Sequence, residues 1–232
     1  MKHWRAGFYA GLPQSLEFER YAKQFDMVEL NATFYGCLHT SGLLFRCRRA
    51  AAVRPSFQYA VKAPQLYTHR KRLITDKVFT DSWACFWRLR PHLGPILFQL
   101  PATFKTTSGK GDKATSNIDR LRRLGEFRDA SWYCEEVYEL GKGGWIGSLE
   151  AGPNPPPERY PLHCCTWGMY VRFHGSQGQY AGCHGAREME RWAGWAKRWA
   201  AQGRSTWLAF NNDSRGQAGR QALFQRPVLG GG

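Results

Sequence analysis

The sequence of 232 residues has no apolar run that approaches the roughly 20 residues of a membrane-spanning helix. Its amino terminus, MKHWRAGFYAG, also lacks the apolar segment of a secretory signal and the pattern of a transit peptide. These absences argue against a membrane partner and predict a soluble, cytoplasmic protein. The expectation of a cytoplasmic location carries one condition, because a truncated amino terminus would remove a targeting segment.

Several motifs of cofactor and covalent chemistry are missing too. The seven cysteines are scattered and include no CxxC pair, so neither a zinc site nor a thioredoxin-type motif is indicated. No glycine-rich phosphate loop follows a predicted strand, and no serine lies in a G-x-S-x-G elbow. The cofactor therefore stays unknown, and covalent catalysis has no support.

Positive charge is abundant, with a formal net charge of +15. A basic surface can bind nucleic acid or another polyanion, but arginine can also be scattered over a surface without forming a site. The densest basic groups are HRKR at 69–72, RCRR at 46–49 and RLRR at 120–123, and they lie in separate segments. This spacing favours scattered charge and keeps nucleic acid as the alternative partner.

Helical and extended patterns alternate along the chain. Helices are predicted at 15–25, 41–53, within 76–90, at 115–124 and at 186–203; strands are predicted at 25–36, 57–64, 94–101, 126–128, 168–175 and 205–213. Residues 145–151 are a weak candidate for a further strand. Alternation of this kind, with several strands apolar on both faces, predicts a parallel sheet covered by helices in one domain over residues 1–232.

Polar side chains collect near the carboxyl ends of the predicted strands. Glu29 and Asn31 are two residues apart and are expected to share a face. Later strands end with comparable residues, namely Lys62, Gln99, Glu126 with Arg128, Arg172 with His174, and the run Asn211, Asn212 and Asp213. In a closed parallel barrel these ends form one rim, where active sites of that fold are built.

The residue types at this rim predict an anion site. Lys62, Arg128 and Arg172 would hold a carboxylate or phosphate group. Glu29, Glu126 or His174 would act as acid or base, with Asn31, Gln99 and Asn212 orienting the ligand and His69 contacting the anion from a neighbouring loop. A structural layer of ion pairs is the alternative. A divalent metal on Glu29, Glu126, His174 and Asp213 is weakly supported, because three cations share the rim, and no metal ligand is assigned.

Six blocks in this order resemble the YecE-like family, also called domain of unknown function 72. They are VELNATFY (28–35), FQYAVKAP (57–64) with the Thr68, His69 and Arg72–Leu73 that follow, LGPILFQLPATF (93–104), EFRDASW (126–132), YVRFHG (170–175) and FNND (210–213) with Gly216. The resemblance implies a TIM-type (β/α)8 barrel and no established reaction. It also marks, without catalytic labels, the positions of Glu29, Asn31, Lys62, Glu126, Arg128, Arg172, His174 and Asn212.

The chain departs from the family pattern in three units. No G-T-S-G-W type strand precedes His3–Tyr9, the fifth strand is short, the sixth is weak, and Asp129 stands where the family has histidine. We therefore expect an incomplete barrel with its first strand absent and its fifth and sixth units degraded. The leading function is an enzyme acting on a small anionic or phosphorylated molecule. The alternatives are a non-catalytic polyanion-binding protein and an inactive truncated family member; the oligomeric state stays open.

Overall fold

The computed structural model describes residues 4–36, 39–72, 77–105, 125–126, 146–151, 168–174, 182–211, 218–219 and 222. The described helices are α1 (Glu17–Gln24), α2 (Thr40–Val53), α3 (Lys77–Trp87) and α7 (Ala186–Ala201). The described strands are β1 (Met27–Leu30), β2 (Gln58–Lys62), β3 (Leu93–Gln99), β4 (Gly125–Glu126), β5 (Ile146–Ala151), β6 (Gly168–Phe173) and β7 (Ser205–Phe210). Short helical turns also occur at Gln14–Leu16, Asn31–Phe34 and Leu66–Arg70.

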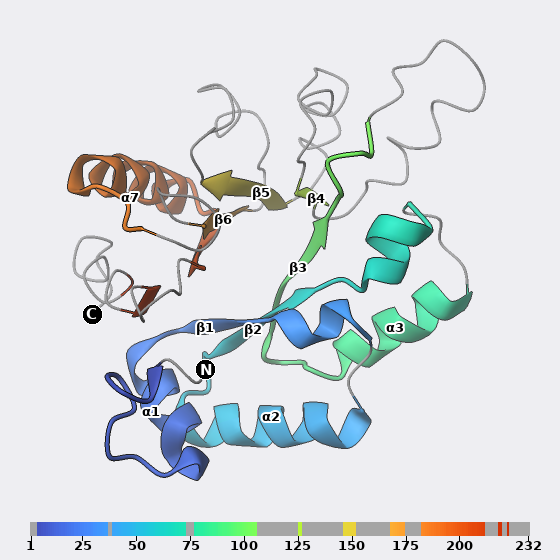
Figure 1. The fold of residues 1–232 in the computed structure, drawn as a ribbon, viewed down its shortest axis with the longest axis horizontal. Coiled ribbons are helices and arrows are strands. Elements are labelled where there is room, and N and C mark those ends of the chain that lie inside the picture. Colours follow the sequence, from blue (N-terminus) through green and yellow to red (C-terminus); the bar gives the residue numbers. More distant parts are fainter. Residues whose placement is uncertain are drawn as a thin grey trace.

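The described strands form two parallel sheets, with the orders β1-β2-β3-β4 and β5-β6-β7. All five strand pairs are parallel, and the described helices α2, α3 and α7 return the chain between β1 and β2, between β2 and β3, and between β6 and β7. The helices α1, α2 and α3 flank the first sheet, and α7 covers the second (Figure 1). The predicted parallel α/β architecture is therefore confirmed, whereas the two sheets are separate in their hydrogen bonding and do not form a closed barrel among the described residues.

The first strand is shorter than the sequence pattern predicted. β1 ends at Leu30, and Asn31 starts a short 3-10 helix that runs to Phe34. Asn31 and Ala32 are exposed, so the apolar run that seemed to continue to Ala32 stops earlier. The hydroxyl of buried Thr33 lies 2.6 Å from the Leu30 carbonyl oxygen, which offers the backbone a turn in place of further extension.

The weak strand candidate at 145–151 is confirmed as β5, and the residues 152–167 that follow it lie outside the described residues. β5 pairs with β6 along its whole length, from Ile146 opposite Gly168 to Ala151 opposite Phe173. The sequence IGSLEA is weak by itself, but all six residues of β6 are buried and supply a firm partner. β4 is only two residues long, in keeping with a short fifth strand. The expected helix at 115–124 and strand residues 127–128 lie outside the described residues.

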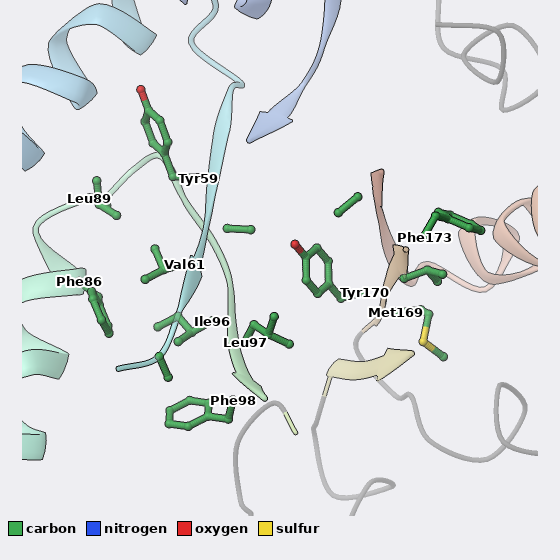
Figure 2. Packing of buried hydrophobic residues seen from close by; sticks show 14 of the residues in the cluster. Tyr59, Val61, Phe86, Leu89, Ile96, Leu97, Phe98, Met169, Tyr170 and Phe173 are labelled. Atoms are coloured by element: carbon green, nitrogen blue, oxygen red, sulfur yellow. The ribbon is translucent and has the colours of Figure 1, made fainter. Parts of the chain in front are cut away.

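Successive buried side chains of β2 and β3 point to opposite sides of the sheet. Val61 and Ile96 are register partners on β2 and β3, and Figure 2 shows them on the side of Phe86 and Leu89 from the α3 segment. Leu97, one residue further along β3, lies on the opposite side, toward Tyr170 of β6 (Figure 2). Leu97 and Tyr170 are both fully buried. Since full burial of a leucine side chain contributes about 1.5–3 kcal/mol, contacts on this side help to hold the two sheets together.

Helix α7 confirms the amphipathic pattern of its sequence. Met189, Trp192, Ala196 and Trp199 are buried, and Trp195 packs against the same core. Trp192 meets Phe173 of β6 edge to face, with ring centroids 5.6 Å apart. None of the described helices has the length and apolarity needed to cross a membrane.

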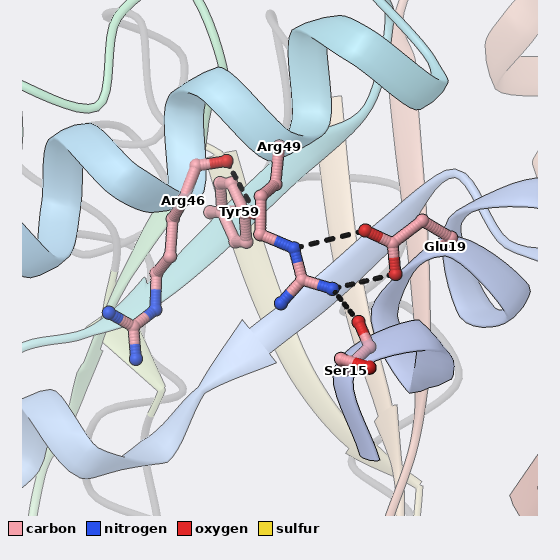
Figure 3. A network of polar contacts seen from close by, with 5 residues as sticks. All are labelled: Ser15, Glu19, Arg46, Arg49 and Tyr59. Atoms are coloured by element: carbon pink, nitrogen blue, oxygen red, sulfur yellow. Dashed lines mark hydrogen bonds and ion pairs between the residues drawn. The ribbon is translucent and has the colours of Figure 1, made fainter. Parts of the chain in front are cut away.

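An ionic contact fastens α1 to α2 (Figure 3). Arg49 donates from Nε to Glu19 Oε1 at 3.2 Å and from Nη2 to Glu19 Oε2 at 2.6 Å; Nη2 also donates to the Ser15 carbonyl oxygen at 2.7 Å. Partial burial acts to raise the pKa of Glu19. The hydrogen bond from Arg49, a backbone hydrogen bond and the positive charges of Arg49 and Lys23 lower it by more. The pKa of Glu19 therefore lies below its ordinary value of 4.5. The pair therefore stabilises the folded chain when Glu19 is ionised.

Replacing Glu19 by glutamine should make the protein less stable in a pH-dependent way. We expect a loss of about 0.5–1 kcal/mol at neutral pH, the upper range for a partly exposed ion pair. Because the folded-state pKa is lowered, the difference from wild type should be full above pH 4.5 and vanish as the pH falls through the folded-state value. Urea unfolding at a series of pH values measures it, with Glu190→Gln on exposed α7 surface as the control. A difference that persists unchanged at acid pH would contradict this account.

Gly168 at the start of β6 is required by close strand packing. A Cβ atom at this position would lie 2.3 Å from the Ser205 carbonyl oxygen and 3.0 Å from the Trp207 ring. Gly168→Ala should therefore lower the free energy of unfolding by about 1–3 kcal/mol, the usual effect of overpacking. Gly194→Ala is the matched control, because no atom lies within 4 Å of its added Cβ; in a helix interior it should stabilise by up to about 1 kcal/mol. Equal effects of the two substitutions would exclude the described β6–β7 contact.

Candidate functional site

The centre of the candidate site is an ion pair between the two sheets. Arg172 on β6 donates from Nε to Glu29 Oε2 at 2.9 Å and from Nη2 to Glu29 Oε1 at 3.0 Å. The side chains of Arg172 and Glu29 are only 3% and 4% exposed. Since Glu29 belongs to β1 and Arg172 to β6, this two-pronged contact joins strands of separate sheets. The expected meeting of these two residues is what the structure shows.

Two further side chains complete the surroundings of this pair. Tyr170 precedes Arg172 by two residues on β6 and donates its hydroxyl hydrogen to Glu29 Oε2. Asn211 follows β7, and with its amide oxygen turned toward Arg172 it accepts from Nε and Nη2, each at 3.2 Å. Buried charges are tolerated when they are paired and hydrogen-bonded in this way. The Glu29–Arg172 pair is thus held from β1, β6 and the end of β7.

A second polar group lies at the carboxyl end of β2. The Lys62 ammonium stands over the Phe34 ring at 4.3 Å from its centroid, and the His69 ring meets the same ring edge to face at 5.2 Å. His69 Nδ1 lies 2.8 Å from the hydroxyl of Thr68, which is buried. Lys62 and His69 are both partly exposed. The Phe34 ring therefore brings two of the predicted anion-binding residues to one place.

Thr33 ties this group to the ends of two strands. Its hydroxyl lies 2.6 Å from the Leu30 carbonyl oxygen and 2.7 Å from the Lys62 carbonyl oxygen. A hydroxyl has one hydrogen to donate, so Thr33 shares it between carbonyls at the ends of β1 and β2. The turn that carries Phe34 is fixed to the strands by this contact.

The remaining predicted residues fall into three classes. Gln99 and His174 are buried at the ends of β3 and β6, each 5% exposed, and Gln99 pairs in register with Glu126 of β4. Asn31 is exposed at the start of the 3-10 helix. Arg128, Asn212 and Asp213 lie outside the described residues, and for Glu126 only the backbone is described. Of the predicted site residues, the structure thus brings Glu29 to Arg172 and, in a second group, Lys62 to His69.

Several side chains that contact the predicted residues were not predicted from the sequence. Tyr170 could have been found by alternation, because it lies two positions before Arg172 and shares its face. Thr33 and Phe34 carried no signal, since both seemed to belong to a continuing strand. Asn211 was visible only as one member of a polar run.

Metal ligation has no geometric support in the part of the chain that is described. No group of three or more histidine, cysteine, aspartate or glutamate side chains lies together there. The metal set considered from the sequence includes Asp213 and the Glu126 side chain, which are not described, so that set stays untested.

The class of protein follows from these observations: a parallel α/β protein whose polar strand ends are organised around a buried carboxylate–guanidinium pair. The chain belongs to the family of proteins of unknown function DUF72, whose model matches residues 1–230. The resemblance noted in the sequence is therefore confirmed. The family description assigns no activity, so the substrate and the reaction remain proposals.

Solved structures of the family share the fold. A DUF72 family protein from Thermotoga maritima superposes with a TM-score of 0.80 at 24% identity, covering 99% of this chain and 95% of that one. A DUF72 family protein from Enterococcus faecalis gives a TM-score of 0.74 at 19% identity, covering 93% and 94% of the two chains. The comparison with curated proteins found no match. At these identities the likeness concerns the fold alone.

Breaking the central pair should destabilise the protein strongly. Glu29→Gln and Arg172→Met are each expected to lower the free energy of unfolding by about 3–5 kcal/mol, because each leaves a buried polar partner uncompensated. The free energy of unfolding that the double variant loses should be smaller, by about 1–3 kcal/mol, than the sum of the losses in the two single variants. Chemical unfolding of the four proteins measures this coupling.

The exposed pair of Arg5 and Glu17 supplies the matched control. Their contact is 2.8 Å long, but the Arg5 side chain is 50% exposed. Glu17→Gln should therefore cost less than about 1 kcal/mol. Strict additivity of the Glu29 and Arg172 variants would show that the pair does not couple the sheets.

Proposed function

We propose that the protein is an enzyme that binds a small anionic or phosphorylated molecule at the carboxyl ends of its parallel strands. The two sheets are, in this proposal, parts of one incomplete TIM-type barrel. Its support is that β4 lies next to β5, β1 approaches β7, and the Glu29–Arg172 contact crosses between the sheets. In such a barrel the strand ends face one mouth, which is the usual place of an active site.

The observation that carries the proposal is the meeting of Lys62 and His69 on the Phe34 ring. Both side chains are partly exposed, and the exposed Arg70 follows directly. Lys62 and Arg70 carry positive charge, and basic side chains that reach solvent at one place attract an anionic ligand.

The Glu29–Arg172 pair takes a positioning role in this proposal. Both oxygens of Glu29 accept hydrogen bonds, and Arg172 is 3% exposed and directed to Glu29. A guanidinium engaged in this way is poorly placed to give up its carboxylate for a ligand. It instead fixes β6, and with it His174, relative to β1. His174 and Glu126 are then the candidates for proton transfer to and from a ligand held by Lys62 and His69.

The test is binding of a panel of phosphorylated and carboxylated small molecules, followed by calorimetric titration of those that raise the melting temperature. Lys62→Met should weaken binding by roughly 10-fold or more, since hydrogen bonds to charged groups contribute about 1.5–3 kcal/mol. Lys197→Met, on the exposed side of α7, is the control and should bind as wild type does. Equal affinity of the Lys62 variant and wild type for every ligand found would place the anion elsewhere.

DNA-binding measurements on the same protein distinguish an enzyme of this kind from a polyanion-binding protein, which is the alternative suggested by the net charge of +15. Affinity for generic single-stranded or double-stranded DNA should be weak and should not depend on Lys62. Tight DNA binding that collapses steeply with salt, together with no small ligand in the panel, would favour the alternative.

A further inference from the structure

Tyr35 is an aromatic side chain that the fold does not use. It is 79% exposed, more than any other large apolar side chain among the described residues. Trp87 and Phe45 are exposed as well, but the guanidinium of Arg90 covers the Trp87 ring at 3.4 Å and that of Arg49 lies 5.5 Å from the Phe45 ring. An aromatic ring stabilises a fold through burial, and Tyr35 at this exposure contributes little of that.

Tyr35 lies next to the group that Lys62, His69 and Phe34 form at the carboxyl end of β2. It directly follows the 3-10 helix Asn31–Phe34, and its ring meets the Phe34 ring edge to face, with centroids 5.4 Å apart. The same Phe34 ring carries the Lys62 ammonium and touches His69. Tyr35 and Lys62 are therefore separated by one aromatic ring, a spacing that a single small molecule can bridge.

The backbone around Tyr35 is fixed, which suits a binding platform. The amide of Tyr35 donates to the Ala32 carbonyl oxygen at 3.2 Å, and Thr33 anchors the same turn to the ends of β1 and β2. Because this backbone is already held, a ligand that stacks on the Tyr35 ring need order only the side chain. Exposed aromatic rings beside cations are the combination that binds a planar ring joined to a phosphate.

We propose that the anionic ligand carries a planar heteroaromatic ring, so that its ring stacks on Tyr35 while its phosphate is held by Lys62 and His69. The chemical class is that of a nucleoside monophosphate. This inference rests on the proposed function, because it adds the ring-binding half of the ligand to the anion-binding half already argued.

The experiment compares three probes. Adenosine has the base without the phosphate, ribose 5-phosphate has the phosphate without the base, and adenosine 5′-monophosphate has both. Calorimetry should show the nucleotide binding roughly 10-fold or more tightly than ribose 5-phosphate, the gain expected from stacking one base. Tyr35→Ala should reduce the affinity for the nucleotide to that for ribose 5-phosphate and leave the latter unchanged. Tyr35→Phe, which keeps the ring, should bind as wild type does.

Two controls separate this inference from the proposed function. Trp87→Ala removes another exposed aromatic ring, at the end of α3 before β3 begins, and should alter neither affinity. Lys62→Met should lower the affinity for the nucleotide and the affinity for ribose 5-phosphate by a similar factor. Saturation-transfer NMR should place the base protons of the nucleotide nearest the protein in wild type and not in Tyr35→Ala.

The outcomes are distinct. Equal affinity for the nucleotide and ribose 5-phosphate in wild type overturns the stacking role of Tyr35 and leaves the anion site standing. A nucleotide preference that survives in Tyr35→Ala places the ring elsewhere and overturns the inference as well. Binding of adenosine alone, unaffected by Lys62→Met, overturns the proposed anion site.

Discussion

The arrangement of the strand ends depends on the buried contact between Glu29 and Arg172. These residues are 143 positions apart, and their two hydrogen bonds connect sheets that share no described backbone ladder. Removing two charges from water is costly, so the contact persists because Tyr170 and Asn211 satisfy the groups that the pair leaves open. Its geometric consequence is that a side chain of β1 and a side chain of β6, from separate sheets, are held in direct contact.

The basic side chains of the described residues lie in two kinds of surroundings. Arg172 and Arg49 are engaged by carboxylates and hold elements of the fold in place. Lys62 and His69 instead both lie against the Phe34 ring, at the partly exposed turns that follow β1 and β2. A net charge of +15 therefore says little about function until each cation is assigned to its neighbour.

Alternation of side chains made the fold and part of the site predictable. The pattern of polar residues two apart brought Glu29 and Arg172 to notice, and the aromatic spacing of 186–203 defined α7. The end of β1 at Leu30 was not predictable, because Thr33 stops the strand through contacts with carbonyls, one of them on β2. Strand β5 was underestimated for a related reason: it pairs along its whole length with β6, a partner that its own sequence does not reveal. Partners from distant segments leave no trace in a local pattern.

The turns that follow β1 and β2 give the site its outward-facing part. Phe34 and Tyr35 come from the first turn and His69 from the second, and a threonine holds each: Thr33 through the Leu30 and Lys62 carbonyls, Thr68 through His69 itself. The Glu29–Arg172 pair, by contrast, is buried, and both carboxylate oxygens accept hydrogen bonds. The turns therefore reach solvent, whereas the side chains of the pair do not. If the proposed function holds, this division between a buried ionic pair and a partly exposed aromatic and basic edge would let binding specificity change at the turns without loss of the fold.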